Sequence, residues 1–317
     1  TLPDCSGRNR MLERGTMPVW LPVTVSAALF QCWRTAMQQK LRHLLSVNGA
    51  GFVRYLYGAP TALVLLVGAL VGTGLPLPAP NVAFVVHCAV GGLMQILATN
   101  LLIMAFGYRN FAVGTAYSKT ETAQSAIIAL FVLHEVLLPA SWIGICIGLA
   151  GVMTLSLAGR GMRPSELARA TVQPAALAGL GAGFLFALTT VFIKLANQAL
   201  TGPSLFVRAL FVLVVTNTLQ IVMQGGFLAL REPRELRKAF TTWRSSAWVG
   251  TLSALGSACW FTAFALAPIG LVRSVGQIEI VFTLTFSRFY LKETLKTGEI
   301  AGLVLVVAGV LLIVLAN

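Results

Sequence analysis

Two glutamates, Glu121 and Glu279, are the residues of this sequence best placed to do chemistry. Each lies in the middle of a long apolar stretch, where a charge costs at least about 2.5 to 3.5 kcal/mol if the stretch spans a membrane. A carboxylate persists there when it exchanges a proton during a transport cycle, or when it forms a permanent ion pair. The candidate cations for such a pair are Arg34, Lys119 and Arg273, and the sequence leaves both interpretations open.

Polar residues surround both glutamates. Helical spacing places Tyr117, Glu121 and Gln124 on one stripe and Lys119 on another. In the stretch around Glu279, Gln277 stands where Lys119 stands in the first, so we expect an asymmetric cavity. The predicted substrate-binding or coupling residues are Glu121, Glu279, Lys119, Tyr117, Gln277, Gln95, Asn100, Arg34 and Trp260. For the uncharged ones, a hydrogen bond between helices or core packing is the alternative to ligand contact.

The composition defines the class of protein that holds these residues. Only 10% of the residues are charged and 57% are apolar, and the mean hydropathy is +0.82, whereas soluble domains carry about 25% charged residues. We therefore expect an all-α integral membrane protein with the lipid bilayer as its surroundings. Windows of about 20 apolar residues predict ten transmembrane helices: 18–38, 49–71, 82–106, 110–133, 140–158, 174–196, 204–229, 246–266, 268–290 and 297–316.

The two halves of the sequence resemble each other. Glu121, Glu135, Gly144 and Gly151 recur as Glu279, Glu293, Gly302 and Gly309, and Lys40 and Arg54 recur as Lys194 and Arg208. Because five spans per copy is an odd number, the second copy must enter the membrane from the opposite side. We predict two inverted five-helix repeats, 17–158 and 174–317, joined by a linker at 159–173 and preceded by a disordered or vector-derived tail at 1–16.

Several residues have structural interpretations instead. Arg54 and Arg208 lie about one turn inside their spans, and Lys40 and Lys194 close theirs, so we expect these long side chains to reach the headgroups. The glycines of the fifth and tenth spans predict a close helix contact, either within the molecule or between two copies, so monomer and homodimer stay open. The five cysteines show no metal spacing and are expected to pack in the core.

Other chemistries lack their motifs. The only aspartate is Asp4, which excludes an aspartyl intramembrane protease, and no phosphate-binding loop is present. His134-Glu135 lacks the second histidine of a zinc-protease motif. We expect no enzyme activity, no cofactor and no metal. The net charge of +13 is explained by membrane topology rather than by a nucleic-acid partner, because no soluble basic module is visible.

Basic residues are concentrated in the loops that follow odd-numbered spans: Lys40, Arg42, Arg109, Arg160, Arg163, Arg169, Arg231, Arg234, Arg237, Lys238, Arg244, Lys292 and Lys296. The positive-inside rule assigns these loops to the cytoplasm and both termini to the outside of a cell inner membrane.

The arrangement of spans resembles the drug/metabolite transporter superfamily, and within it the EamA-type transporters. The matching segments are Arg54, Asn110 to Thr115, Glu135 and Gly144 to Val152 in the first repeat, and Arg208, Ala267 to Gly270, Glu293 and Gly302 to Val310 in the second. The resemblance implies a secondary carrier, commonly an exporter of amino acids or other small metabolites, with a central cavity between the repeats. It also implies cytoplasmic termini, against the charge distribution.

We therefore predict a secondary transporter of a small metabolite, an amino acid or related solute, that works by alternating access, with possible proton coupling. An anion or organic-phosphate exchanger of the same fold and a non-transporting scaffold or receptor are the alternatives.

Overall fold

The structure is a computed structural model that describes residues 18–41, 44–107, 111–158, 173–202, 204–290 and 297–316. Helices and no strands are found in these ranges. The predicted tail at 1–16, the linker at 159–172, Glu293 and the basic residues Arg42, Arg109, Lys292 and Lys296 fall outside them, as does the side chain of Lys40. The helices are α2 (Trp20–Leu41), α3 (Val47–Leu56), α4 (Gly58–Thr73), α5 (Val82–Gly107), α6 (Phe111–Ser118), α7 (Glu121–Val132), α8 (Pro139–Ala158), α10 (Pro174–Ala199), α11 (Leu205–Arg231), α12 (Pro233–Thr241), α13 (Trp243–Leu266), α14 (Ile269–Gly276), α15 (Glu279–Tyr290) and α16 (Thr297–Ala316).

Several of these helices are suited to a membrane. Five helical stretches of the described chain are long and apolar enough to cross one: Val47–Thr73, Val82–Ala105, Pro174–Ala199, Leu205–Arg231 and Trp243–Leu266. Pro139–Leu155 and Ile300–Ala316 are shorter apolar helices. Their outer faces carry exposed apolar side chains such as Val64, Val222 and Val304, which a bilayer would cover.

The expectation of continuous helices at 110–133 and 268–290 is wrong, because each segment consists of two helices. The first breaks between α6 and α7, at Lys119 and Thr120, and the second breaks between α14 and α15, at Gln277 and Ile278. At both breaks the backbone forms bonds to the third residue back, such as Lys119 N–H to Ala116 and Gln277 N–H to Ser274. A shorter interruption at Tyr57 separates α3 from α4.

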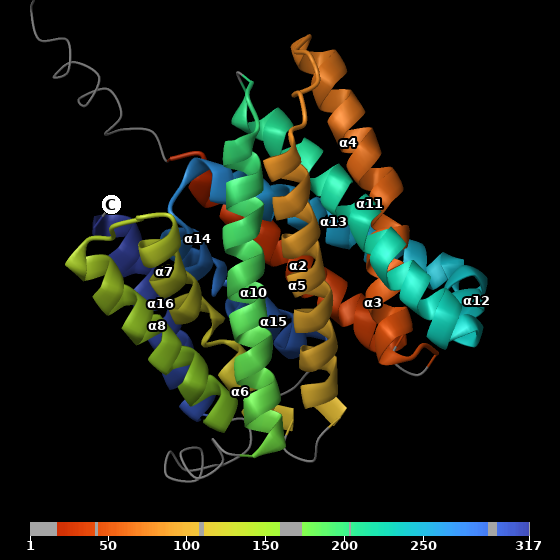
Figure 1. The fold of residues 1–317 in the computed structure, drawn as a ribbon. Helices are drawn as coiled ribbons and strands as arrows, with labels where there is room; N and C mark the ends of the chain where they lie inside the picture. The colour runs from red at the N-terminus through yellow and green to blue at the C-terminus, as the bar shows by residue number, and fades with distance from the viewer. Residues whose placement is uncertain are drawn as a thin grey trace, which may run out of the picture.

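The first and second halves of the chain pack closely into each other. Helix α10 packs along α5, α13 packs along α2, and α16 packs along α8. Figure 1 shows α8 and α16 side by side at one edge of the molecule, α10 and α5 in the middle, and α4 and α11 at the other edge. No layer therefore belongs to one half alone.

The contact between α8 and α16 depends on glycine. A Cβ added to Gly151 would lie 2.7 Å from the backbone nitrogen of Val306, and one added to Gly309 would lie 2.7 Å from the carbonyl oxygen of Gly144. These distances are shorter than any normal contact, so the two backbones touch only because no side chain separates them. The glycine ridges thus pack against each other within one molecule.

Helix α12 was not expected from the sequence, and it ties the α11–α13 connection to the start of α3. Glu232 accepts hydrogen bonds from Ser46 (3.0 Å) and Asn48 (2.6 Å), and Glu235 accepts one from the Ser46 backbone N–H (2.7 Å). Both carboxylates thereby stabilise the N-terminus of α3. Partial burial opposes ionisation of Glu235, but hydrogen bonds from Lys238 and Ser46 outweigh it and hold its pKa below the usual range.

Substitution of Gly151 by alanine should destabilise the fold, because the added methyl group meets backbone atoms of α16 that cannot move independently. We expect a loss of about 1 to 3 kcal/mol, visible as a lower unfolding temperature in detergent. Gly68→Ala in α4 is the matched control, since no atom lies within 4 Å of its added Cβ and alanine favours the helix. Equal stability of the two variants would contradict the glycine-dependent contact.

Candidate functional site

Both glutamates singled out by the sequence begin a helix. Glu121 is the first residue of α7, and Glu279 is the first residue of α15. Each carboxylate therefore lies in the first turn of its helix, where the positive end of the helix dipole favours a negative charge. This position stabilises a carboxylate deep in an apolar bundle. Neither break contains proline, so no local sequence signal marks it.

Glycines on neighbouring helices let the broken segments approach closely. A Cβ at Gly183 of α10 would lie 3.0 Å from the carbonyl oxygen of Ser118, which directly precedes the first break. A Cβ at Gly276, at the second break, would lie 2.3 Å from the ring of Trp260. The breaks are therefore seated against α10 and α13 and do not project into open space.

Two ion pairs connect α6–α7 to α14–α15, and each joins the two halves of the chain. Arg273 lies 2.8 Å from Glu121, and Lys119 lies 3.5 Å from Glu279. The Arg273 pair is a charge contact without hydrogen-bond alignment; the guanidinium also donates to Thr190 at 2.6 Å. The Lys119 pair is longer, and its lysine is more exposed, with 34% of the side chain accessible against 15% for Arg273.

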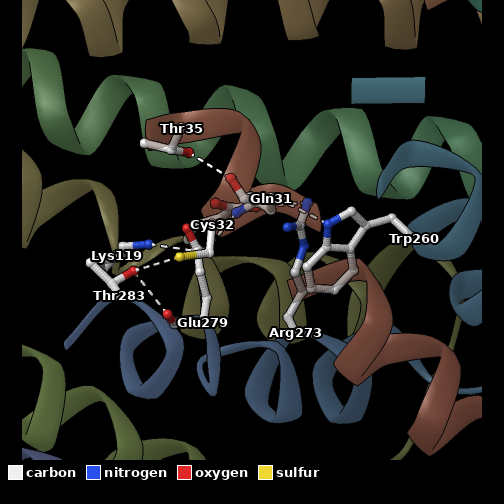
Figure 2. Close-up of polar contacts among 9 residues, drawn as sticks. Gln31, Cys32, Thr35, Lys119, Trp260, Arg273, Glu279 and Thr283 are labelled. Atoms are coloured by element: carbon white, nitrogen blue, oxygen red, sulfur yellow. Dashed lines mark hydrogen bonds and ion pairs between the residues drawn. The ribbon is translucent and has the colours of Figure 1, made fainter. Parts of the chain in front are cut away.

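Aromatic and amide groups surround these pairs. The guanidinium of Arg273 lies 5.1 Å from the centre of the Trp260 ring, within the range of a cation–π contact. Gln31 donates to Glu279 at 2.7 Å and accepts the indole N–H of Trp260 at 3.0 Å. Figure 2 shows Gln31 between Trp260 and Glu279, with Lys119 on the far side of Glu279. These contacts connect Arg273, Trp260, Gln31, Glu279 and Lys119 into one network.

The network lies on the wall of a cavity of about 640 Å³, a size typical of small-molecule sites. The wall is formed by residues of both chain halves, and its polar residues include Gln31, Arg34, Gln38, Ser46, Arg54, Gln95, Thr99, Lys119, Glu121, Thr189, Thr190, Ser257, Arg273, Glu279 and Thr283. The cavity reaches Leu45, Ser46 and Val47, where α2 joins α3.

A second buried cluster joins α10, the connection between α7 and α8, and the start of α14. Lys194 forms an ion pair with Glu135 and donates to the carbonyl of Ala267 at 2.8 Å, while Glu135 accepts the N–H of Ile269 at 2.7 Å. His134 has a left-handed φ of 55°, and this turn directs Glu135 back toward Lys194. The expectation that Lys194 reaches the headgroups is therefore wrong, because a buried carboxylate partner binds it inside the protein.

Six of the nine predicted site residues line the cavity: Glu121, Glu279, Lys119, Gln95, Arg34 and Trp260. The other three lie elsewhere. Asn100 donates to Asn48 at 3.0 Å, Gln277 lies against Gly148 of α8, and Tyr117 lies on α6 outside the lining. The break after Ser118 interrupts the helical spacing that would place Tyr117 and Glu121 on one face, and Glu121 lines the cavity while Tyr117 does not.

Sequence reasoning missed Arg54 as a cavity residue. Its side chain is only 6% exposed, it donates to Thr99 at 3.2 Å and to Ser253 at 3.4 Å, and it lines the cavity. The expectation that Arg54 reaches the headgroups is therefore wrong. Arg208, its counterpart in the second half, is half-buried and donates to the carbonyl of Leu200 at 2.9 Å. The position of Arg54 inside an apolar stretch is the sequence feature that could have indicated a buried, functional side chain.

Comparison with known protein families finds a match in the second half of the chain. Residues 173–315 match the EamA-like transporter family. EamA-like proteins form part of the drug/metabolite transporter superfamily, and they are transporters rather than enzymes. Together with the apolar helices described above, the match supports a multi-pass membrane protein. For the matching family it implies the bilayer and a small-molecule substrate as partners.

The fold is also found in a solved protein. The structure matches a chain titled "Crystal structure of protein", with a TM-score of 0.70 over 95% of this chain and 97% of the other, at 16% sequence identity. At this identity the match shows a shared fold for nearly the whole chain and nothing about substrate. No curated protein matches the sequence.

Substitution of Glu135 by glutamine should destabilise the fold, since it leaves Lys194 buried without a charge partner. Removing one member of a buried pair costs about 3 to 5 kcal/mol, and we expect a corresponding fall in the unfolding temperature. Lys238→Gln, in an ion pair whose lysine is 53% exposed, is the control and should cost no more than about 1 kcal/mol. Effects of equal size in thermal unfolding would contradict a stabilising role of the buried pair of Lys194 and Glu135.

Proposed function

We propose that this protein is a secondary transporter that moves a small solute across the membrane by alternating access. The observation that supports this best is the cavity of about 640 Å³ between the two halves of the chain, with ion pairs that join those halves on its wall. A solute that enters such a cavity contacts both halves, so its binding can change how the halves are arranged.

The proposal includes ten transmembrane helices in two inverted repeats, 17–158 and 174–317, with a linker at 159–173. The packing is consistent with this symmetry. In the proposed symmetry α2 corresponds to α10, and α5 corresponds to α13. The symmetry therefore converts the observed helix pair α2–α13 into the other observed pair, α10–α5. Helices α8 and α16 also correspond, and they pack against each other, as expected beside a two-fold axis.

Alternating access requires that one end of the cavity be closed while the other is accessible. Within the proposal, the ion pair of Lys194 and Glu135 marks the closed end, and the part of the cavity lined by Ser46 marks the accessible end. Arg231, Arg234, Arg237, Lys238 and Arg244, on or beside α12, follow an odd-numbered proposed span. By the positive-inside rule that end faces the cytoplasm of an inner membrane, with both termini outside.

The proposal includes proton coupling through Glu121 and Glu279. The Lys119–Glu279 pair is the more open of the two, so it is the pair that a solute or proton can separate with less loss. The proposed solute is an amino acid or related metabolite, and the proposed direction is export. An anion or organic-phosphate exchanger is the second candidate, favoured by the excess of cationic side chains on the cavity wall.

Proteoliposomes that contain a pH-sensitive dye test this function. Pooled amino acids and metabolites should produce a solute-dependent proton signal with the wild-type protein. In Glu121→Gln or Glu279→Gln the signal should fall at least about tenfold, because an amide neither releases a proton nor balances the adjacent cation. Glu166→Gln, a carboxylate in the proposed linker, is the control and should retain the wild-type rate.

The outcomes separate the parts of the proposal. Solute movement without a proton signal in any variant would contradict coupling and leave the transporter in place as a facilitator or exchanger. Absence of movement for every solute, in folded wild-type protein, would contradict the transporter and favour a scaffold or receptor.

A further inference from the structure

The charged residues on the cavity wall do not balance. Among the described residues of the wall, four cationic side chains, Arg34, Arg54, Lys119 and Arg273, accompany two carboxylates, Glu121 and Glu279. Lys119 and Arg273 each lie within ion-pair distance of one of those carboxylates. The two positive charges in excess are therefore those of Arg34 and Arg54.

Arg34 and Arg54 have no carboxylate within ion-pair distance among the residues that the structure describes. Arg54 has neutral partners, the hydroxyls of Thr99 and Ser253, which accept its N–H groups but do not neutralise its charge. The Nε atom of Arg34 is buried without any hydrogen-bond partner in the described chain. Both guanidinium groups therefore line the cavity with a positive charge that no described carboxylate neutralises.

The two arginines also share one space of low polarity. Arg34 on α2 and Arg54 on α3 both line the same cavity. Two like charges close together in an apolar bundle are unfavourable unless an anion lies between or beside them. Guanidinium groups form paired hydrogen bonds to the oxygens of carboxylates and phosphates. A carboxylate or phosphate is therefore the ligand that would best neutralise Arg34 and Arg54.

We propose that Arg34 and Arg54 form a subsite for the anionic group of the transported solute, a carboxylate or a phosphate. The proposal rests on the transport function above and defines its substrate class as an organic anion. The remainder of such a solute would contact the aromatic side chains Trp260, Phe261 and Phe264, which line the same cavity.

The second half of the chain supplies a natural comparison. Arg208 corresponds to Arg54 in the repeat, but its guanidinium binds the carbonyl of Leu200 and it is not part of the cavity lining. The proposed subsite therefore belongs to the first half of the chain only. Neutralising Arg208 removes the same charge from the protein without touching the subsite.

Binding of small aromatic probes to the full-length protein in detergent tests the subsite. Phenylacetate and phenyl phosphate carry the two candidate anions, and 2-phenylethanol and 2-phenylethylammonium are matched probes without one. We expect at least one anionic probe to bind and the neutral and cationic probes to bind at least tenfold more weakly, by calorimetric titration. Arg34→Gln and Arg54→Gln should each weaken the anion at least tenfold, Arg54→Lys should weaken it less, and Arg208→Gln should leave it unchanged.

Three results would overturn the subsite. The first is no binding of either anionic probe up to about 10 mM, a concentration that detects weak ligands. The second is binding of 2-phenylethanol as tight as that of the anions, and the third is an equal loss of anion affinity in Arg208→Gln and Arg54→Gln. Arg54→Lys retains the charge, so it keeps the test valid if Arg54→Gln does not fold. Flux of neutral or cationic solutes in proteoliposomes, unaffected by Arg34→Gln, would overturn the subsite while the transporter stands. Absence of flux for every solute would overturn the transport function itself.

Discussion

A carboxylate buried among apolar helices needs a cationic partner, and for three glutamates of this protein the partner comes from the other half of the chain. Glu121 pairs with Arg273, and Glu279 pairs with Lys119. Glu135 pairs with Lys194. Each pair links residues that are more than fifty positions apart in the sequence, so none can form until the two halves have packed together. These pairs join the two halves, and the pairs of Glu121 and Glu279 do so on the cavity wall.

The broken helices make the arrangement possible. A continuous helix through residues 110–133 would place Lys119 and Glu121 on different faces, and only the interruption before Glu121 brings both to the cavity. The same interruption turns a helix N-terminus toward the carboxylate. Glycines at the breaks and between α8 and α16 then allow the close backbone contacts that such segments need. The polar network and the close helix packing thus both depend on the interrupted helices.

Much of this could be anticipated from the sequence, and the failures have physical causes. Glu121, Glu279 and Lys119 stand out because charges are rare in apolar stretches. Arg54 and Lys194 were misassigned because a long side chain near a helix end can reach either headgroups or a buried partner, and the choice depends on Thr99, Ser253 and Glu135 in distant helices. Both helix breaks lack proline, so nothing local predicted them. The displacement of Tyr117 from the cavity follows from the first break.

The central claim is that the pair of Glu121 and Arg273 couples the two halves, and a double-mutant cycle measures this coupling directly. Unfolding free energies in detergent would be determined for the wild type, Glu121→Gln, Arg273→Met and the double variant. We predict that the double variant is more stable than the sum of the single losses implies, by at least about 1 kcal/mol, because either single change leaves a buried group without its partner. Losses that add within about 0.3 kcal/mol would show that the two residues act independently, and would contradict the account.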